Sequence, residues 1–400
     1  MTRDDVTGPA ATVEGLQPYA VTIFAEMSAL AASAGAVNLG QGFPDEDGPP
    51  AMLQKAQEAI AHGVNQYPPG LGIPELRQAI ATQRHRQYGI DYHPDTEVLV
   101  TVGATEAIAA SVLGLVEPGD EVIVIEPFYD SYSPVIAMAG AHRRAVPMVP
   151  DGRGFALDLD ALRNAITPRT KALIVNSPHN PTGTVLTDDE LLKLAELATH
   201  HDLLVITDEV YEHLVFDDRR HLPLAGYPGM RDRTLTISSA AKMFNCTGWK
   251  IGWVCGAPEL IKGARAAKQY LTYVGGAPFQ PAVAYALNHE QQWVDRLRAA
   301  LQAKRDSLSH ALTEIGFDVH DSAGTYFLCA DPRPLGYEDS TSFCMTLPET
   351  AGVAAIPMSA FCDPHSAHFN EWNHLVRFAF CKRDETMDEA IQRLGSLRRA

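Results

Sequence analysis

Short apolar runs alternate with amphipathic segments through the middle of the chain. The apolar runs predict buried strands at residues 97–102, 121–126, 171–176, 203–207, 234–238 and 251–256. Residues 104–116 and 187–201, which lie between such runs, have the spacing of amphipathic helices, and the second opens with a capping-box pattern at Thr187 and Glu190. Apolar strands that alternate with helices are typical of a mostly parallel sheet with helices on both faces.

The last third of the chain has a different pattern. Residues 294–315 predict one long amphipathic helix, and short strands are expected near 325–330, 352–358 and 374–380. This order is typical of an α+β domain. We therefore expect three parts, namely an N-terminal segment (residues 1–47) packed on the small domain, a large domain (48–290) and a small α+β domain (291–400). A ligand cleft is expected between the two domains.

Composition narrows the functional classes. Of the 400 residues, 46% are hydrophobic and 20% are charged, so the chain can bury a large core and is not generally disordered. The formal net charge of −17 argues against binding to nucleic acids or anionic membranes. The N-terminal residues do not resemble a signal peptide, and no run approaches the ~20 apolar residues of a membrane span. We expect a soluble cytoplasmic protein.

The cysteines indicate neither a zinc site nor a disulfide framework. There are 6 of them, and no pair has C-x-x-C spacing. We therefore expect buried free thiols and no bound metal.

Polar residues follow several of the predicted strands. Lys242 lies among small residues just after the fifth strand, where partial desolvation would lower its pKa and make it a nucleophile; the alternative is an ordinary surface lysine. Asp208 follows the fourth strand, so its carboxylate is expected in the crevice at the carboxyl ends of the strands; the alternative is a helix N-cap. Asn180 follows the third strand in a polar turn that could equally be a Pro-rich connecting loop.

Two more strand ends could bind a phosphate and a planar ring. At Gly103 a strand gives way to a helix, where the backbone amides of Ala104 and Thr105 and the Thr105 hydroxyl form an anion site. The segment lacks the glycine spacing of P-loops and of dinucleotide-binding turns. Tyr129 follows the second strand and is either a ring-stacking residue or part of the core. Together, an amine, a carboxylate, a ring and anion donors are what a planar, phosphorylated, aldehyde-bearing cofactor requires.

The order of these motifs resembles one family. The segments NLGQGFPD, NQYPPG, NSPHNPTG, TDEVY and SSAAKMF–GWKIGW resemble those of the fold-type I pyridoxal-phosphate aminotransferases of class I/II, and the resemblance covers residues 15–395. Within the family the chain is similar to the kynurenine and glutamine transaminase branch, and most of all to the bacterial N-succinyldiaminopimelate aminotransferases. The resemblance implies an α/β fold, in which a large domain has a mostly parallel seven-stranded sheet covered by helices and a smaller domain is α+β. It also implies pyridoxal 5'-phosphate as cofactor and a homodimer with shared active sites.

The same resemblance implies a role for each motif residue. Lys242 matches the lysine that holds the cofactor's aldehyde carbon and moves the substrate α-proton, and Asp208 matches the carboxylate that keeps the ring nitrogen protonated. The other implied cofactor contacts are Asn180 and Tyr211 to the ring hydroxyl oxygen, Tyr129 on the ring face, Ala104, Thr105, Ser239 and Lys250 on the phosphate, and Tyr67 on the phosphate of the neighbouring subunit. The implied substrate contacts are Gly42, Asn180, Tyr19 and Arg377, of which Arg377 binds the α-carboxylate. The chain departs from many relatives at Lys250, where they carry arginine, and near Tyr19, where they carry tryptophan.

The implied activity is transfer of an amino group between an amino acid and a 2-oxo acid, with ping-pong kinetics. The expected reaction uses N-succinyldiaminopimelate, in lysine biosynthesis, with 2-oxoglutarate and glutamate as the other pair. A kynurenine-, glutamine- or methionine-type aminotransferase with cysteine-conjugate β-lyase activity stays open, because the motifs surround the cofactor and not the distal part of the substrate. A cofactor-binding regulator is not expected, because the short acidic N-terminal segment leaves no room for a DNA-binding domain.

Overall fold

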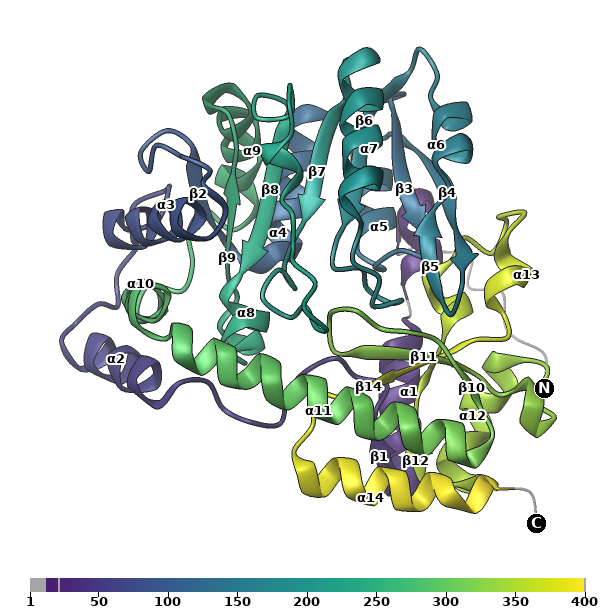
Figure 1. The fold of residues 1–400 in the computed structure, drawn as a ribbon. Coiled ribbons are helices and arrows are strands. Elements are labelled where there is room, and N and C mark those ends of the chain that lie inside the picture. Colours follow the sequence, from purple (N-terminus) through teal and green to yellow (C-terminus); the bar gives the residue numbers. More distant parts are fainter. Residues whose placement is uncertain (1–11, 21, 399–400) are drawn as a thin grey trace, which may run out of the picture.

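The computed structural model describes residues 12–20 and 22–398. They form a large sheet between layers of helices and, below it in Figure 1, a smaller α+β part under which the C-terminal helix runs. Residues 1–11, which belong to the segment compared with signal peptides, lie outside the described residues. None of the described helices is long and apolar enough to cross a membrane.

Eight strands form the large sheet, in the order β2-β9-β8-β7-β6-β3-β4-β5. Their bounds are Val98–Val102 (β2), Glu121–Glu126 (β3), His142–Asp151 (β4), Gly154–Leu157 (β5), Thr170–Asn176 (β6), Leu204–Asp208 (β7), Thr234–Ser239 (β8) and Ile251–Cys255 (β9). Neighbours from β8 to β4 pair in parallel, whereas β9 and β5 run antiparallel to their neighbours. The predicted, mostly parallel sheet is confirmed, with one strand more than the seven expected. No strand was predicted at β4 or β5, because charged residues open β4, Pro147 and Pro150 interrupt its apolar run, and β5 is short.

Helices cover both faces of the sheet because alternate strand residues point to opposite sides. In β3, Val122 and Val124 pack toward one face and Ile123 and Ile125 toward the other. The first face carries α4 (Gly103–Leu115), α5 (Tyr132–Met138) and α9 (Pro258–Leu271), and the second carries α6 (Leu159–Ala165) and α7 (Asp188–His200). The β2–β9 end packs with α2 (Pro50–Ala61), α3 (Pro74–Tyr88) and α10 (Phe279–His289). The capping box at the start of α7 is confirmed.

The last part of the chain builds a second, antiparallel sheet. Its strands, in spatial order, are β10 (Asp318–Val319), β11 (Phe327–Asp331), β14 (Val376–Ala379) and β13 (Ile356–Pro357). The helices of this part are α11 (Gln291–Ile315), α12 (Ser340–Thr350), α13 (Phe369–Trp372) and α14 (Asp384–Leu394). Short 3-10 helices occur at Leu224–Gly226, Thr247–Trp249, Arg333–Leu335, Met358–Phe361 and Gly395–Leu397.

The N-terminal segment lies against this second part. It contains the 3-10 helix η1 (Glu14–Tyr19), α1 (Ile23–Ala34) and β1 (Val37–Asn38), and β1 pairs in parallel with β12 (Val353–Ala354). One core cluster includes side chains of the large sheet and of β11, so the exact domain boundaries stay predictions. All six cysteines are buried and free, as expected.

Candidate active site

A cavity of about 210 Å³ lies where β6, β7 and β8 end. Parallel strands present their carboxyl ends at one edge of a sheet, so the turns that follow them meet there. Nine of the residues predicted to contact a cofactor line this cavity: Ala104, Thr105, Tyr129, Asn180, Asp208, Tyr211, Ser239, Lys242 and Lys250. Segments separated by more than a hundred residues are therefore brought to one site.

Lys242 lies in α8 (Ala240–Met243), a single turn that begins directly after β8. Its Nζ atom is 3.4 Å from the backbone oxygen of Gly42 and lies over the rings of Tyr211 and Tyr326, at 5.8 and 5.4 Å from the ring centres. Burial lowers the pKa of Lys242 to about 8, and the nearby Cys381 and Asp208 oppose this shift. The amine is therefore much closer to its neutral, nucleophilic form than a surface lysine is.

Asp208 is the last residue of β7 and is buried. The Tyr132 hydroxyl donates to its Oδ2 atom at 2.8 Å, and the Val210 amide donates to its Oδ1 atom at 3.4 Å. Burial raises the pKa of Asp208 to about 6, and the bond from Tyr132 opposes this shift. No helix begins at this residue, so the alternative of a helix N-cap is wrong. The turn instead directs a carboxylate into the cavity.

Arg377, on β14, is 2% exposed and has no carboxylate among its hydrogen-bond partners in the described chain. It donates to Oδ1 of Asn180 at 2.9 Å and to the Gly40 oxygen at 2.8 Å, whereas its Nε atom has no partner among the described residues. Its guanidinium lies 3.9 Å from the ring centre of Phe327 and 4.6 Å from that of Phe361. Burial lowers the pKa of Arg377 to about 10. A buried cation with an unused donor is suited to bind an anionic ligand.

The start of α4 has the form of an anion site. Its N-cap residue, Val102, makes no side-chain cap bond, which leaves the first amides of the helix open to a ligand. Gly103 has φ +73°, and a Cβ atom there would come within 3.1 Å of the Lys250 side chain. Lys250 itself adopts a left-handed conformation, with φ 54°. Strained backbone of this kind occurs at ligand sites, where the surrounding structure enforces it.

Four predicted residues lie outside the cavity lining. Gly42 reaches the site through its carbonyl oxygen, next to Lys242, and Arg377 through Asn180. Tyr67 is 81% exposed and packs edge-on against Tyr273. Tyr19 ends η1, and it is partly buried and not among the residues that line the cavity.

Two residues that matter to the site had only a weak signal in the sequence. Tyr132 donates to Asp208, and the Tyr326 hydroxyl donates to the Gly42 oxygen. The sequence shows both only as aromatic residues that could contact a substrate side chain. Their hydroxyl contacts join residues 76 and 284 positions apart, and no local pattern predicts such pairs.

Three arginines that a distal carboxylate of a substrate could have used, Arg143, Arg144 and Arg153, have other partners. Arg143 binds Ser133 and Asp363, Arg144 pairs with Glu121, and Arg153 donates to a backbone oxygen. None of the three lines the cavity.

Comparisons with known proteins agree with this geometry. A model of the family described as aminotransferase class I and II matches residues 34–394. The chain is 74% identical over 390 residues to a Mycobacterium tuberculosis protein named "Probable N-succinyldiaminopimelate aminotransferase DapC", covering 96% of this chain and 98% of the relative. It is 39% identical over 383 residues to the methionine aminotransferase of Escherichia coli, covering 96% and 97% of the two chains.

Solved structures give the same result. The N-succinyldiaminopimelate aminotransferase of Mycobacterium tuberculosis superimposes with a TM-score of 0.95 and 74% identity, covering 97% of this chain and 100% of the other. The aspartate aminotransferase of Thermus thermophilus with maleate superimposes with a TM-score of 0.89 and 33% identity, covering 97% and 100%.

Proposed function

This chain belongs to the class I and II aminotransferase family and is an aminotransferase, and we propose that it uses pyridoxal 5'-phosphate in the cavity at Lys242. One observation carries the proposal. The Lys242 amine, with its lowered pKa, and the buried Asp208 carboxylate line the same cavity, and the Arg377 guanidinium adjoins it through Asn180. An amine, an acid and a carboxylate-binding cation are the groups that this chemistry requires.

The residues of the cavity fit this cofactor. Thr105, Ser239 and Lys250, with the amides at the start of α4, would hold a phosphate. Asn180 and Tyr211 would donate to the ring hydroxyl oxygen, and the ring of Tyr129 would lie against the ring face. When bound, pyridoxal phosphate supplies an aldehyde that condenses with amines and a pyridinium ring that accepts electrons.

Three side chains would act on the substrate and the ring. Arg377 binds the α-carboxylate and so orients the α-carbon toward Lys242. The Lys242 amine, in its neutral form, takes the proton from the α-carbon and later returns a proton to the acceptor. The Asp208 carboxylate would favour the protonated form of the ring nitrogen, and Tyr132 holds that carboxylate in place.

We propose N-succinyldiaminopimelate as the amino-group substrate, with glutamate and 2-oxoglutarate as the second pair. The support is the 74% identity to the mycobacterial protein of that name, over nearly the whole of both chains. Substrate and second pair would use one site in turn, so ping-pong kinetics are expected.

We also propose that two copies of this chain share their active sites. Large exposed side chains occur at Tyr67, Tyr270, Leu271 and Tyr273, and exposed apolar surface of this kind is typical of interfaces. Tyr67 would then contact the phosphate bound by the partner. Light scattering after size exclusion is expected to give twice the mass of one 43.4-kDa chain.

Two measurements test the function. Purified protein given pyridoxal phosphate is expected to gain a visible absorbance band that hydride reduction fixes on Lys242. With 2-oxoglutarate as acceptor, kcat/KM is expected to be higher for N-succinyldiaminopimelate than for kynurenine, glutamine or methionine. A protein that stays colourless would overturn the cofactor, whereas a preference for kynurenine or methionine would overturn only the substrate. Release of pyruvate from a β-substituted alanine without acceptor would indicate β-lyase activity.

A further inference from the structure

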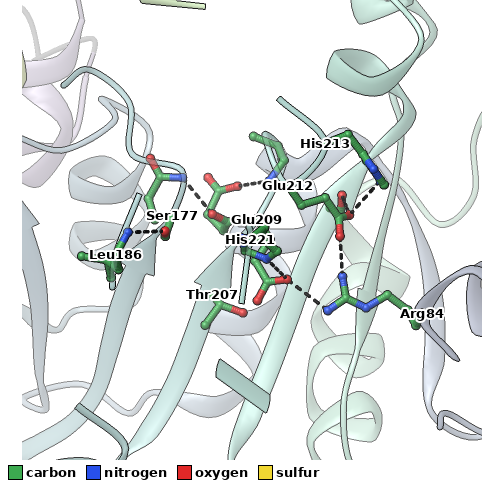
Figure 2. A network of polar contacts seen from close by, with 12 residues as sticks. Arg84, Ser177, Leu186, Thr207, Glu209, Glu212, His213 and His221 are labelled. Atoms are coloured by element: carbon green, nitrogen blue, oxygen red, sulfur yellow. Dashed lines mark hydrogen bonds and ion pairs between the residues drawn. The ribbon is translucent and has the colours of Figure 1, made fainter. Parts of the chain in front are cut away.

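The turn after β7, which carries Asp208 and Tyr211, also carries part of a buried ion network on the side away from the cavity. Figure 2 shows this network. Arg84 of α3 donates from Nη1 to Glu212 at 2.7 Å and from Nη2 to Glu209 at 3.0 Å. These three residues are only 0%, 4% and 2% exposed, respectively. One planar guanidinium therefore bridges two carboxylates of the same turn.

Two histidines and a serine complete the network. Nε2 of His221 lies 3.0 Å from Glu209, and Nε2 of His213 lies 3.8 Å from Glu212. Dashed lines mark these contacts in Figure 2. The Ser238 hydroxyl donates to the second oxygen of Glu212 at 2.6 Å. Since Ser238 lies on β8, just before Ser239 and α8, the network joins α3 to the ends of both β7 and β8.

A metal ion is not the best interpretation of this cluster. Glu209, Glu212 and His221 offer ligand atoms within 4.8 Å of one another, a set that could hold a cation by itself. The guanidinium of Arg84 contacts an oxygen of each carboxylate, and it would repel a second cation at this distance. Arg84 therefore supplies the positive charge that the two carboxylates need.

Residues of the turn face opposite sides. Asp208 and Tyr211 line the cavity, whereas Glu209 and Glu212 point to Arg84. The Glu209 amide donates to the Ile237 oxygen of β8 at 2.8 Å, which ties the start of the turn to its neighbour strand. The side chains that line the cavity and those that contact Arg84 come from one short backbone segment. A displacement of Glu209 and Glu212 would therefore also move Asp208 and Tyr211.

We propose that Arg84 is a positioning residue for transamination, which acts through Glu209 and Glu212 to fix the turn that presents Asp208 and Tyr211. This inference rests on the proposed function. Bonds from a rigid guanidinium fork define orientation as well as position, which a lysine cannot do with a single ammonium. Buried ion pairs contribute little net stability compared with apolar packing, so their geometric effect is the better reason for this network.

Arg84→Met in the holoenzyme tests the proposal, and Arg77→Met is the matched control. Arg77 lies on the same helix and is 6% exposed, but it binds Asp95 and the Pro94 oxygen, away from the turn. Arg84→Met is expected to lower kcat by roughly 10- to 100-fold, with the KM of the amino donor changed less than about threefold. It is also expected to weaken pyridoxal phosphate binding by about tenfold, measured by titration of the cofactor-free protein. Arg84→Lys should fall between wild type and Arg84→Met.

Hydrogen exchange gives a second readout that does not depend on activity. In cofactor-free protein, Arg84→Met is expected to speed amide exchange in peptide 205–216 by a clearly larger factor than in peptide 98–102, because a local loosening of the turn adds to the general loss of stability. Arg77→Met should leave peptide 205–216 unchanged. A role in stability alone would instead speed exchange by the same factor in both peptides.

The outcomes separate the two proposals. If Arg84→Met and Arg77→Met show the same kcat, cofactor affinity and exchange in peptide 205–216, the positioning role is overturned. If wild-type protein itself fails to bind pyridoxal phosphate, the proposed function fails instead. Should Arg84→Met not fold, Glu212→Gln removes one of the two bridged charges while keeping the size of the side chain. It is expected to lower kcat by about tenfold, and wild-type kcat in that variant would also overturn the role.

Discussion

The two sides of the turn after β7 are both poorly accessible to water, but their charged groups are paired very differently. On the side of the turn away from the cavity, Glu209 and Glu212 each contact the guanidinium of Arg84. On the cavity side, Lys242 makes one long contact with a backbone oxygen, and Asp208 accepts its shortest hydrogen bond from a neutral tyrosine. Buried charges are costly unless they are paired, so pairing within the chain indicates a structural role and its lack indicates a site for a ligand.

The largest expected effect comes from Lys242→Met. This variant should lower transaminase turnover by a factor on the order of 10⁴ or more, because the nucleophile and base are removed together. The same change should raise the Tm of the cofactor-free protein at pH 7 by about 2 °C, since it removes a partly buried charge that has no carboxylate partner among the described residues.

The pH dependence of that gain follows from the pKa of Lys242, which burial lowers to about 8. Below pH 8 the lysine is charged in both folded and unfolded protein, so the full penalty for burying its charge is present. As the pH rises from about 8 toward the ordinary lysine value, only the unfolded state stays protonated, and the wild type regains stability. The Tm difference between variant and wild type should therefore shrink over this range, as scanning calorimetry would measure. A Tm difference that does not change with pH would contradict the assignment.

Arg84→Met should have the opposite effect on stability. Removing one partner of a buried ion pair leaves uncompensated charge, so the free energy of unfolding should fall by about 3–5 kcal/mol. Urea unfolding of the cofactor-free protein would measure the loss. A variant as stable as wild type would remove the distinction between the two sides of the turn.

Arg377→Lys tests the anion site next to the cavity. Lysine has a single ammonium in place of a guanidinium that can donate two hydrogen bonds to one carboxylate. The KM of the amino donor should therefore rise by roughly 10- to 100-fold, with a smaller change in kcat. Steady-state kinetics would measure both values. Arg153→Lys, at an exposed arginine outside the cavity, serves as the control and should leave both unchanged. An unchanged KM in Arg377→Lys would mean that the α-carboxylate binds elsewhere.

Tyr132→Phe should have the smallest effect. Its hydroxyl bond holds down the pKa of Asp208, which burial raises to about 6. Asp208 is ionised above this pKa, so cofactor affinity should be lost as the pH falls through about 6 in the wild type and at a higher pH in the variant. Near pH 6.5 the affinity should differ by about tenfold or less, because one hydrogen bond to a charged group is lost. Fluorescence titration between pH 5.5 and 8 would show the shift, and coincident curves would contradict it.

Much of the fold could be predicted from local pattern. The apolar runs at β3, β6 and β7 were found because buried parallel strands are continuously apolar, and β8 was found because its leucine and isoleucine alternate with threonines. The hairpin β4–β5 was not found, because Pro147 and Pro150 interrupt the apolar run of β4 and β5 is short. Most predicted cofactor contacts line one cavity for a related reason, since most of them lie at the end of a strand or within a few residues after it. The position of Tyr19 was much harder to predict, because it follows no strand and lies on a short 3-10 helix.

The sequence by itself determined most of the parallel strands and the turns that follow them, and hence that Lys242, Asp208, Asn180 and Thr105 meet at one edge of the sheet. Only the tertiary structure decided which charges are paired. Arg84 lies 125 and 128 residues from its two carboxylates, and nothing in its local sequence distinguishes it from Arg77 or Arg86 on the same helix. Side-chain pairing over such separations depends on how helix and sheet pack together, whereas strand ends and turns are set by neighbouring residues along the chain.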